Sequence, residues 1–381
     1  FLPKMYILIL KGRYIKMKIN TRKTADKIEN TYEVYEMTTN LGLIVALSPI
    51  GASIQKIAIQ TEPGEELSIA LSFQNTSDGL PGAGYAGATL GPNAGRICSS
   101  QLPIDNQIFN LVPNENSHQL HGGPHNLSTI KWNIDSVVCS HDFVKIQFSA
   151  FQPDNLDGFP GNRTYQAIYT LDDTNWLTVE YAAWTDTPTY INLSNHTYWN
   201  LSGDFSRSGL EQELTICSNN MCLLNTEFLP KDIIPVAGTA FDFRSPRHPD
   251  AAIRASRDEL SCSQIHIGKG YNHAYLLNRP NPFRSVRSIR HTQPLKKACV
   301  LRDISSGRTL KLMTDAPALV LYTGGYLPEH LLLSNSQYSH PSCAIALEAQ
   351  DLPDVMHLLP NAYHLTTPSQ PFHRIIRFHV I

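Results

Sequence analysis

The middle of the chain is a succession of short segments with strand character, and this pattern limits the possible folds more than any other feature. Such segments recur at intervals of roughly 10–20 residues, with Asp-Gly, Pro-Gly and Asp-Asp turns among them. The clearest are Val144–Ser149, Tyr165–Leu171, Trp176–Ala183 and Tyr190–Leu201. The only helix that the pattern suggests lies around Asp250–Leu260. The sequence therefore predicts an all-β fold, a sandwich or a barrel.

Composition excludes several classes of protein. The 381 residues are 42% apolar, which is enough for a sizeable core, and 31 Lys and Arg nearly balance 33 Asp and Glu. This balance argues against nucleic-acid binding, which usually needs a basic surface. No apolar run approaches the ~20 residues that a membrane-spanning helix needs, so no membrane association is expected. Seven Cys, an odd number without a CxxC pair, fit reduced thiols in a cytoplasmic protein.

The two ends of the chain differ in pattern. Residues 1–30 are basic and show no clear periodicity, so we expect an N-terminal extension that is poorly ordered. Residues 31–381 carry the strand pattern to the end of the chain, where the segment RIIRFHVI is expected to complete a sheet. These residues are therefore predicted to form a single β-sandwich domain.

The stretch Tyr190–Leu201 (YINLSNHTYWNL) has two unlike faces if it is a strand. One face is mostly apolar. The other is a row of hydrogen-bonding groups made of Asn192, Ser194, His196, Tyr198 and Asn200. Such a row suits a polyhydroxylated ligand, because hydroxyls need donors and acceptors and sugar C–H faces pack on aromatic rings. A solvated strand face with an incidental histidine explains the periodicity equally well.

Two glycine-containing segments before this stretch carry further candidates. Leu80–Ile97 contains five glycines, which allow the backbone to approach a ligand or another strand closely, and it ends in Arg96. Its spacing is not that of a dinucleotide-binding loop. His121 precedes the Gly122-Gly123 pair, whose turn can give the imidazole a fixed direction. Taken alone, Arg96 could also be an ordinary surface charge.

The segment Cys343–Gln350 (CAIALEAQ) places one carboxylate, Glu348, on an otherwise small and apolar strand. A carboxylate in such a setting lowers stability unless it is paired or hydrated. The alanines that share its face leave room, either for a cleft or for a close sheet contact. Glu348 is therefore a candidate functional residue.

Several of these segments together resemble the aldose 1-epimerases, the galactose mutarotases. The resemblance runs from about residue 32 to 381 and rests on eight motifs in the family's order. They are GATLGPNAGRI (87–97), HQLHGGP (118–124), DGFPG (157–161), INLSNHTYWNL (191–201), PVAGTAFDFR (235–244), KGYNHAYLL (269–277), LYTGGYL (321–327) and ALEAQDLPD (346–354).

The resemblance implies a large antiparallel β-sandwich of the galactose mutarotase-like type, with a sugar cleft on its concave sheet. It implies an isomerase that interconverts the α and β anomers of a hexose such as glucose or galactose. His196 would be the acid and Glu348 the base, on opposite sides of the sugar, with a gap between them wide enough for one sugar ring. Sugar contacts are expected from Arg96, His121, Tyr198, Asn272, Gln350 and Tyr326. The reaction demands no cofactor and no metal, and the expected partner is the small-molecule sugar, bound by a monomer or homodimer.

The sequence departs from the family pattern at a few positions. Asn272 stands where the family commonly has Asp, and Gly95 where it usually has Asn. Gly325 and Tyr326 replace an Asn and a Phe. An amide must donate to one of the hydroxyls that a carboxylate would accept from, so affinity or sugar preference is expected to differ. Both catalytic residues are kept, so the reaction is not.

Three alternatives remain at this point. A non-catalytic carbohydrate-binding protein on the same fold would not need both His196 and Glu348. A glycoside hydrolase would need two carboxylates facing each other across the cleft, and only Glu348 has a convincing strand context. An epimerase for a hexose phosphate would call for clustered Arg or Lys near the motifs, and the sequence shows none there.

Overall fold

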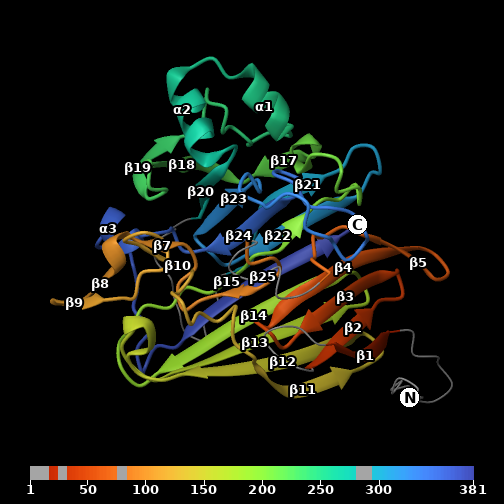
Figure 1. Cartoon of the computed structure of the whole chain (residues 1–381), viewed down its shortest axis with the longest axis horizontal. Helices are drawn as coiled ribbons and strands as arrows, with labels where there is room; N and C mark the ends of the chain where they lie inside the picture. The colour runs from red at the N-terminus through yellow and green to blue at the C-terminus, as the bar shows by residue number, and fades with distance from the viewer. Residues whose placement is uncertain (1–16, 25–31, 75–83, 280–293) are drawn as a thin grey trace.

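Antiparallel sheets dominate the structure, a computed structural model that describes residues 17–24, 32–74, 84–279 and 294–381 (Figure 1). The prediction of an all-β antiparallel fold is confirmed. Within the described residues there are three larger sheets, of five, eight and six strands, and three two-stranded pairs. The five-stranded sheet lies at one side of the molecule, and α1 and α2 cap the end farthest from β11 (Figure 1).

The five-stranded sheet has its strands in chain order: β1 (Lys18–Thr24), β2 (Tyr32–Thr38), β3 (Leu43–Ser48), β4 (Ser53–Glu62) and β5 (Glu65–Ser68). The eight-stranded sheet has the order β11 (Asn133–Cys139), β12 (Phe143–Gln152), β13 (Arg163–Asp172), β14 (Trp176–Thr185), β25 (Phe372–Val380), β22 (Thr309–Thr314), β21 (Lys296–Arg302) and β17 (Glu213–Ile216). The six-stranded sheet has the order β16 (Tyr198–Trp199), β24 (Ile345–Gln350), β23 (Ala318–Tyr322), β20 (Asn272–Leu277), β18 (Ser218–Leu224) and β19 (Pro230–Pro235).

The short pairs join β7 (Arg96–Ile97) to β10 (Gln119–Leu120), β6 (Thr89–Leu90) to β15 (Ser194–Asn195), and β8 (Gln101–Ile104) to β9 (Gln107–Asn110). Single 3₁₀ turns occur at η2 (Cys98–Ser100), η3 (Leu156–Gly158) and η4 (Gly209–Glu211). The C-terminal segment forms β25 in the middle of the eight-stranded sheet, as expected from its sequence. β21 and β22 pair as an antiparallel hairpin.

The main hydrophobic core lies between the eight-stranded sheet and the other two large sheets. Along β12, β13 and β14 every second residue is buried, which is the period that a sheet with one covered face requires. The core residues of β12 (Val144, Ile146, Phe148) lie in the same cluster as those of β3 and of β24. Two sheet layers that share one core make the β-sandwich that the resemblance implied.

The helical prediction is only partly right. The segment around Asp250–Leu260 falls across two helices, α1 (Pro249–Ala255) and α2 (Glu259–Gly268), with a break at Ser256. The Asp258 carboxylate accepts a hydrogen bond from the Ser261 amide and so caps the start of α2. A further short helix, α3 (Val355–Leu358), was not predicted.

The stretch Tyr190–Leu201 is not one strand. Ser194–Asn195 pair with β6, whereas Tyr198–Trp199 pair with β24 of the six-stranded sheet. The chain therefore crosses from one sheet to another at His196 and Thr197. The alternation is still visible, because the apolar face of the stretch lies in the main core.

One described strand lies within the predicted N-terminal extension. Lys18–Thr24, which the sequence places in a poorly ordered extension, form β1 and pair with β2 over seven residues. The extension prediction is wrong for these residues, and residues 1–16 and 25–31 lie outside the described part. All seven Cys are free thiols. Among the described residues, no helix has the length and apolar character that a membrane-spanning helix requires.

Candidate active site

A cavity of about 370 Å³ opens on one face of the six-stranded sheet. Strand register explains how residues far apart in the chain come to line it. Across β20, β23 and β24, Ala274 pairs with Val320 and Val320 with Glu348. The next row joins Asn272 to Tyr322. Paired residues point to the same face of a sheet, so these side chains form the floor of one site.

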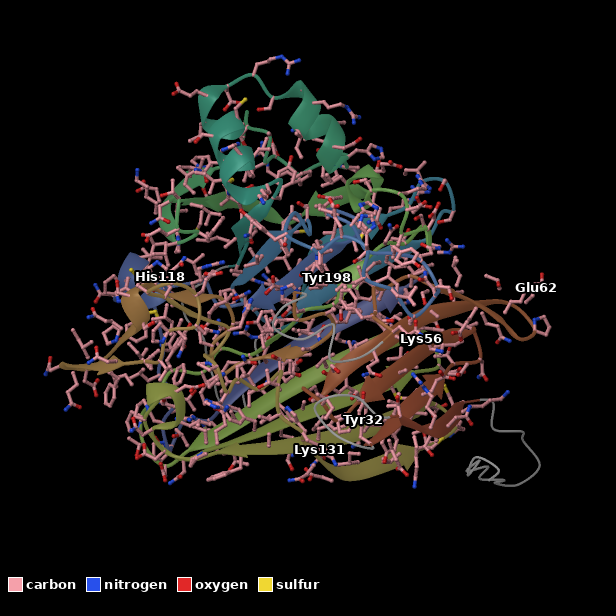
Figure 2. All side chains as sticks on the ribbon, viewed as in Figure 1. Tyr32, Lys56, Glu62, His118, Lys131 and Tyr198 are labelled. Atoms are coloured by element: carbon pink, nitrogen blue, oxygen red, sulfur yellow. The ribbon has the colours of Figure 1, made fainter. Side chains whose placement is uncertain are left out.

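All of the site residues predicted from the sequence line this cavity. They are Arg96, His121, His196, Tyr198, Asn272, Tyr326, Glu348 and Gln350. Of the polar row on Tyr190–Leu201, only His196 and Tyr198 are among them. Figure 2 labels Tyr198 near the middle of the molecule, where the sheets meet. Asn192 and Ser194 instead hydrogen-bond to backbone carbonyls, so the prediction of one ligand-binding row is wrong for these residues.

His196 and Glu348 meet at the bottom of the cavity. Nε2 of His196 lies 3.6 Å from Oε1 of Glu348, and both side chains are about 95% buried, with 5% and 4% exposed. The expected gap of a whole sugar ring is therefore wrong: the two groups stand side by side on one wall. This spacing suits two oxygens of a sugar that are bonded to the same carbon.

The backbone around His196 is fixed by a glycine contact. The His196 amide donates to the Ala88 carbonyl, and the Gly87 amide donates to the His196 carbonyl, both at 3.0 Å. A side chain at Gly87 would lie 1.9 Å from the Ile54 carbonyl oxygen. The glycine-rich segment thus serves a close approach between strands, and this approach positions the imidazole. Residues 80–83 of that segment lie outside the described part.

Burial shifts both members of the pair toward their neutral forms. It raises the pKa of Glu348 to about 8, although the Arg96 charge and a hydrogen bond from Gln350 Nε2 (3.0 Å) act in the opposite direction. It lowers the pKa of His196 to about 4. The two groups together therefore carry one proton between about pH 4 and pH 8. Perturbed titration of this kind is typical of acid–base catalysts.

His121 is held as a hydrogen-bond donor toward the cavity. Its Nδ1 accepts a hydrogen bond from the Gly95 amide at 3.1 Å, and burial together with His196 and Arg96 lowers its pKa well below the usual value. A neutral imidazole that accepts at Nδ1 carries its proton on Nε2. His121 can therefore donate to a sugar oxygen, as the sequence suggested.

Aromatic rings form a wall beside His196 and Glu348. The rings of Tyr85 and His121 meet edge to face at 4.8 Å, and those of His196 and Tyr198 lie 4.7 Å apart. Tyr198 donates to the Gly84 carbonyl at 2.9 Å, which fixes its ring. Tyr322 packs against Tyr198 with 5.9 Å between the ring centres. Such walls suit the C–H faces of a sugar.

Sequence reasoning missed several lining residues, among them Tyr85, Glu115, Phe228 and Tyr322. Glu115 holds Arg96 through two hydrogen bonds, from Nε at 2.5 Å and from Nη2 at 2.8 Å. The only sequence signal for Glu115 is its place six residues before His121. Phe228 lies under the Arg96 guanidinium, with 5.0 Å to the ring centre. No group of three or more His, Cys, Asp or Glu among the described residues could hold a metal ion.

Comparison with known proteins identifies the family. The model of the aldose 1-epimerase family matches residues 33–359. The chain is 29% identical to an aldose 1-epimerase of Escherichia coli over 331 residues, which are 85% of this chain and 87% of that protein. It is 33% identical to an aldose 1-epimerase of Haemophilus influenzae over 273 residues, or 71% and 72% of the two chains.

A solved structure shares the fold of this chain. The crystal structure of a galactose 1-epimerase from Lactobacillus acidophilus superposes with a TM-score of 0.80 at 26% identity, covering 96% of this chain and 99% of that one. The family model alone spans most of the sequence, and the sheet arrangement is shared. The chain therefore belongs to the aldose 1-epimerase family.

Proposed function

We propose that this protein interconverts the α and β anomers of a free hexose, glucose or galactose, with His196 and Glu348 as the proton-transfer pair. The observation that carries the proposal is the buried contact of 3.6 Å between these two groups in a cavity of about 370 Å³. The names of the relatives, aldose 1-epimerase and galactose 1-epimerase, support the same reaction and substrate class.

The reaction needs one base and one acid beside the anomeric carbon. Glu348 removes the proton of the anomeric hydroxyl while His196 gives a proton to the ring oxygen, and the bond from that carbon to the ring oxygen breaks. The aldehyde then rotates about its bond to the next carbon, and the ring closes on the other face. Each proton transfer of this kind contributes typically ~10²–10⁴-fold. Because both oxygens are bonded to one carbon, two groups standing side by side can reach them.

The single proton of the pair fits this cycle. The reaction starts with the proton on His196 and ends, once the ring has opened, with the proton on Glu348. Burial favours the second arrangement, since it leaves both groups neutral. The Arg96 charge and an anomeric hydroxyl donating to the carboxylate favour the first. Both arrangements contain the same number of protons, so the pair can return to its starting state when the ring closes.

The remaining predicted residues contact the sugar or orient Glu348. His121 donates through Nε2, and the rings of Tyr198 and Tyr326 supply apolar contact. The Asn272 side chain makes no hydrogen bond to another described residue and faces the cavity, so its amide is free for a hydroxyl. Gln350 orients the Glu348 carboxylate.

We also propose that the protein acts in the cytoplasm, as a monomer or a homodimer. Light scattering after size-exclusion chromatography distinguishes the monomer from the homodimer.

Polarimetry of freshly dissolved α-glucose and α-galactose tests the function. The wild type is expected to speed the approach to anomeric equilibrium, and His196→Asn and Glu348→Gln are each expected to lose about 10²-fold or more of this rate. Glu211→Gln, at an exposed carboxylate that does not line the cavity, is the control and should match the wild type. If the wild type is inactive but either sugar raises its melting temperature, the protein is a carbohydrate-binding protein instead.

A further inference from the structure

The Arg96–Glu115 pair stands at the mouth of the cavity, above the catalytic pair. Its side chains are 17% and 29% exposed, against 5% and 4% for His196 and Glu348. A hexose whose anomeric carbon reaches the catalytic pair therefore turns other hydroxyls toward Arg96 and Glu115. Among the described lining residues, Glu115 and Glu348 are the only carboxylates.

The Arg96 guanidinium is fixed on two sides but retains free donors. Its Nε and Nη2 atoms hydrogen-bond to the two Glu115 oxygens, and one face of the group lies over the Phe228 ring at 5.0 Å. The Nη1 atom makes no hydrogen bond to any residue in the described part of the chain. An arginine held in this way keeps a planar donor edge available for a ligand.

The Glu115 carboxylate likewise retains acceptor capacity. Each of its oxygens accepts one N–H from Arg96, and a carboxylate oxygen can accept a second hydrogen bond. No other side chain in the described residues donates to it. Both charges act on two aromatic residues of the cavity: burial raises the pKa of Tyr85 and of Tyr326, Glu115 raises both further, and Arg96 opposes both shifts.

We propose that Glu115 is a specificity residue, and that the Arg96–Glu115 pair recognises two neighbouring hydroxyls of an aldose at positions remote from the anomeric carbon. One hydroxyl donates to Glu115 and the next accepts from Arg96, so the ion pair supplies an acceptor and a donor side by side. This inference rests on the proposed function, because it needs an aldose bound with its anomeric carbon at His196 and Glu348. It assigns the sugar contact to a residue outside the sequence motifs.

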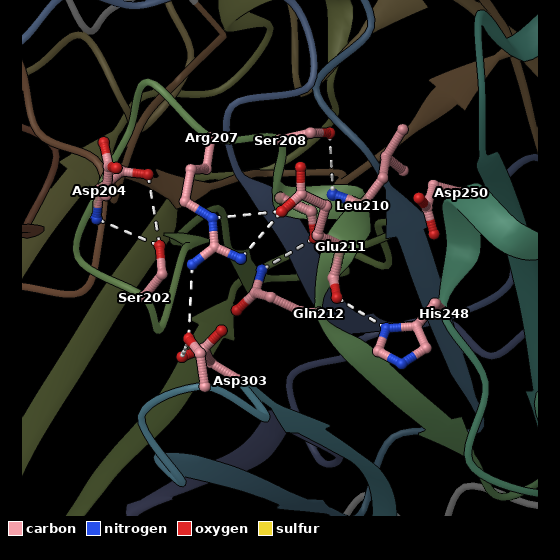
Figure 3. Close-up of polar contacts among 12 residues, drawn as sticks. Ser202, Asp204, Arg207, Ser208, Leu210, Glu211, Gln212, His248, Asp250 and Asp303 are labelled. Atoms are coloured by element: carbon pink, nitrogen blue, oxygen red, sulfur yellow. Dashed lines mark hydrogen bonds and ion pairs between the residues drawn. The ribbon is translucent and has the colours of Figure 1, made fainter.

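A matched ion pair elsewhere in the chain provides the control. Arg207 holds Glu211 through Nε at 3.2 Å and Nη2 at 2.9 Å, and Figure 3 shows this pair among other polar side chains. Neither residue lines the cavity. Glu115→Gln and Glu211→Gln remove the same charge from the same kind of pair. Both variants are expected to keep the melting temperature within a few degrees of the wild type, because partly exposed ion pairs contribute little to stability.

The test combines kinetics with deoxy sugars. For the preferred hexose, Glu115→Gln is expected to raise KM roughly tenfold, the loss typical of a charge-assisted hydrogen bond, and to change kcat by less than about threefold. The 3-, 4- and 6-deoxy analogues leave the reacting atoms intact. For the wild type, one analogue should bind roughly 10–100-fold more weakly than the parent sugar, and in Glu115→Gln this penalty should fall to a few-fold.

Two outcomes would overturn the inference. One is a Glu115→Gln variant with the KM of the wild type. The other is a variant that binds every analogue more weakly by the same factor, which would mean that Glu115 acts only by holding Arg96. Calorimetric dissociation constants of the parent sugar and the analogues repeat the comparison without catalysis. An inactive wild type would thus contradict the proposed function, whereas binding constants that are equal in wild type and variant contradict the role of Glu115.

Discussion

The titration of two buried side chains is what connects this site to its chemistry. The usual order of the two pKa values is reversed in Glu348 and His196. Burial raises the pKa of the carboxyl to about 8 and lowers that of the imidazole to about 4. Below pH 4 both groups hold a proton and no base is left. Above pH 8 neither holds one and no acid is left.

We therefore expect kcat/KM for mutarotation to follow a bell with limbs near pH 4 and pH 8. The activity falls as the pH drops through the lower limb and as it rises through the upper one. Polarimetric initial rates between these limits, corrected for spontaneous mutarotation in each buffer, measure the profile. A rate that keeps rising with pH beyond the upper limb would show that Glu348 alone must be ionised and that no acid is needed.

Individual residues were predictable from the sequence to different degrees. Glu348 stood out because a carboxylate on a small, apolar strand is costly without a reason, and His196 and Arg96 stood out within motifs. Glu115 gave no such signal, because its role depends on a contact with Arg96 across a loop. The spacing of His196 and Glu348 also could not be read from residue types, since it follows from how β16 and β24 pair.

At the scale of elements, the segment just before β6 decides where His196 lies, just after β15. Its backbone passes so close to the start of β4 that only glycine fits at position 87. Gly87 also has φ +71°, which disfavours any side chain. Gly87 and Ala88 are hydrogen-bonded to the backbone of His196. The close packing at Gly87 therefore fixes the position from which the imidazole extends.

Gly87→Ala is therefore expected to lower the free energy of unfolding by roughly 3–5 kcal/mol, because the β4 backbone must move aside. Activity should fall with it at temperatures where the variant is still folded. Gly64→Ala is the control: Gly64 has φ +87°, but a Cβ there meets nothing within 4 Å. It should cost about 1 kcal/mol. Urea denaturation compares the two, and equal losses would contradict the close-contact argument.

Strand content was easier to predict than strand boundaries. The alternation is strict in β12 and β13 and is interrupted in β14 only by the buried Ala182, because one face of the sheet covers the core. The stretch Tyr190–Leu201 shows the same alternation, yet it divides between β15 and β16, since neighbours from two different sheets bind it. The helix around Asp250–Leu260 was likewise placed correctly but split in two, because the Asp258 cap starts a second helix. Long-range pairing, which local patterns do not contain, decided the first case, whereas a local cap between Asp258 and Ser261 decided the second.

At the scale of the whole molecule, the two sheet layers are also joined by a buried ionic contact. Arg374 of β25 in the eight-stranded sheet donates to Asp351, which follows β24 of the six-stranded sheet, at 2.8 Å. Its Nε lies 3.6 Å from Asp315, between β22 and β23. Tyr190 also donates to Asp351, at 3.1 Å. All three charged side chains are less than 10% exposed.

Arg374→Met is expected to lower the free energy of unfolding by roughly 3–5 kcal/mol near pH 8, since two buried carboxylates lose their guanidinium. Burial already raises the pKa of Asp315 and Arg374 opposes this, so in the variant the carboxyl takes up a proton more readily. The cost should therefore shrink as the pH falls. Arg207→Met, at the exposed pair in Figure 3, should cost less than about 1 kcal/mol. Urea titrations of both variants at pH 8 and pH 5 measure this, and a pH-independent loss equal to that of the exposed pair would show that the contact does not hold the layers together.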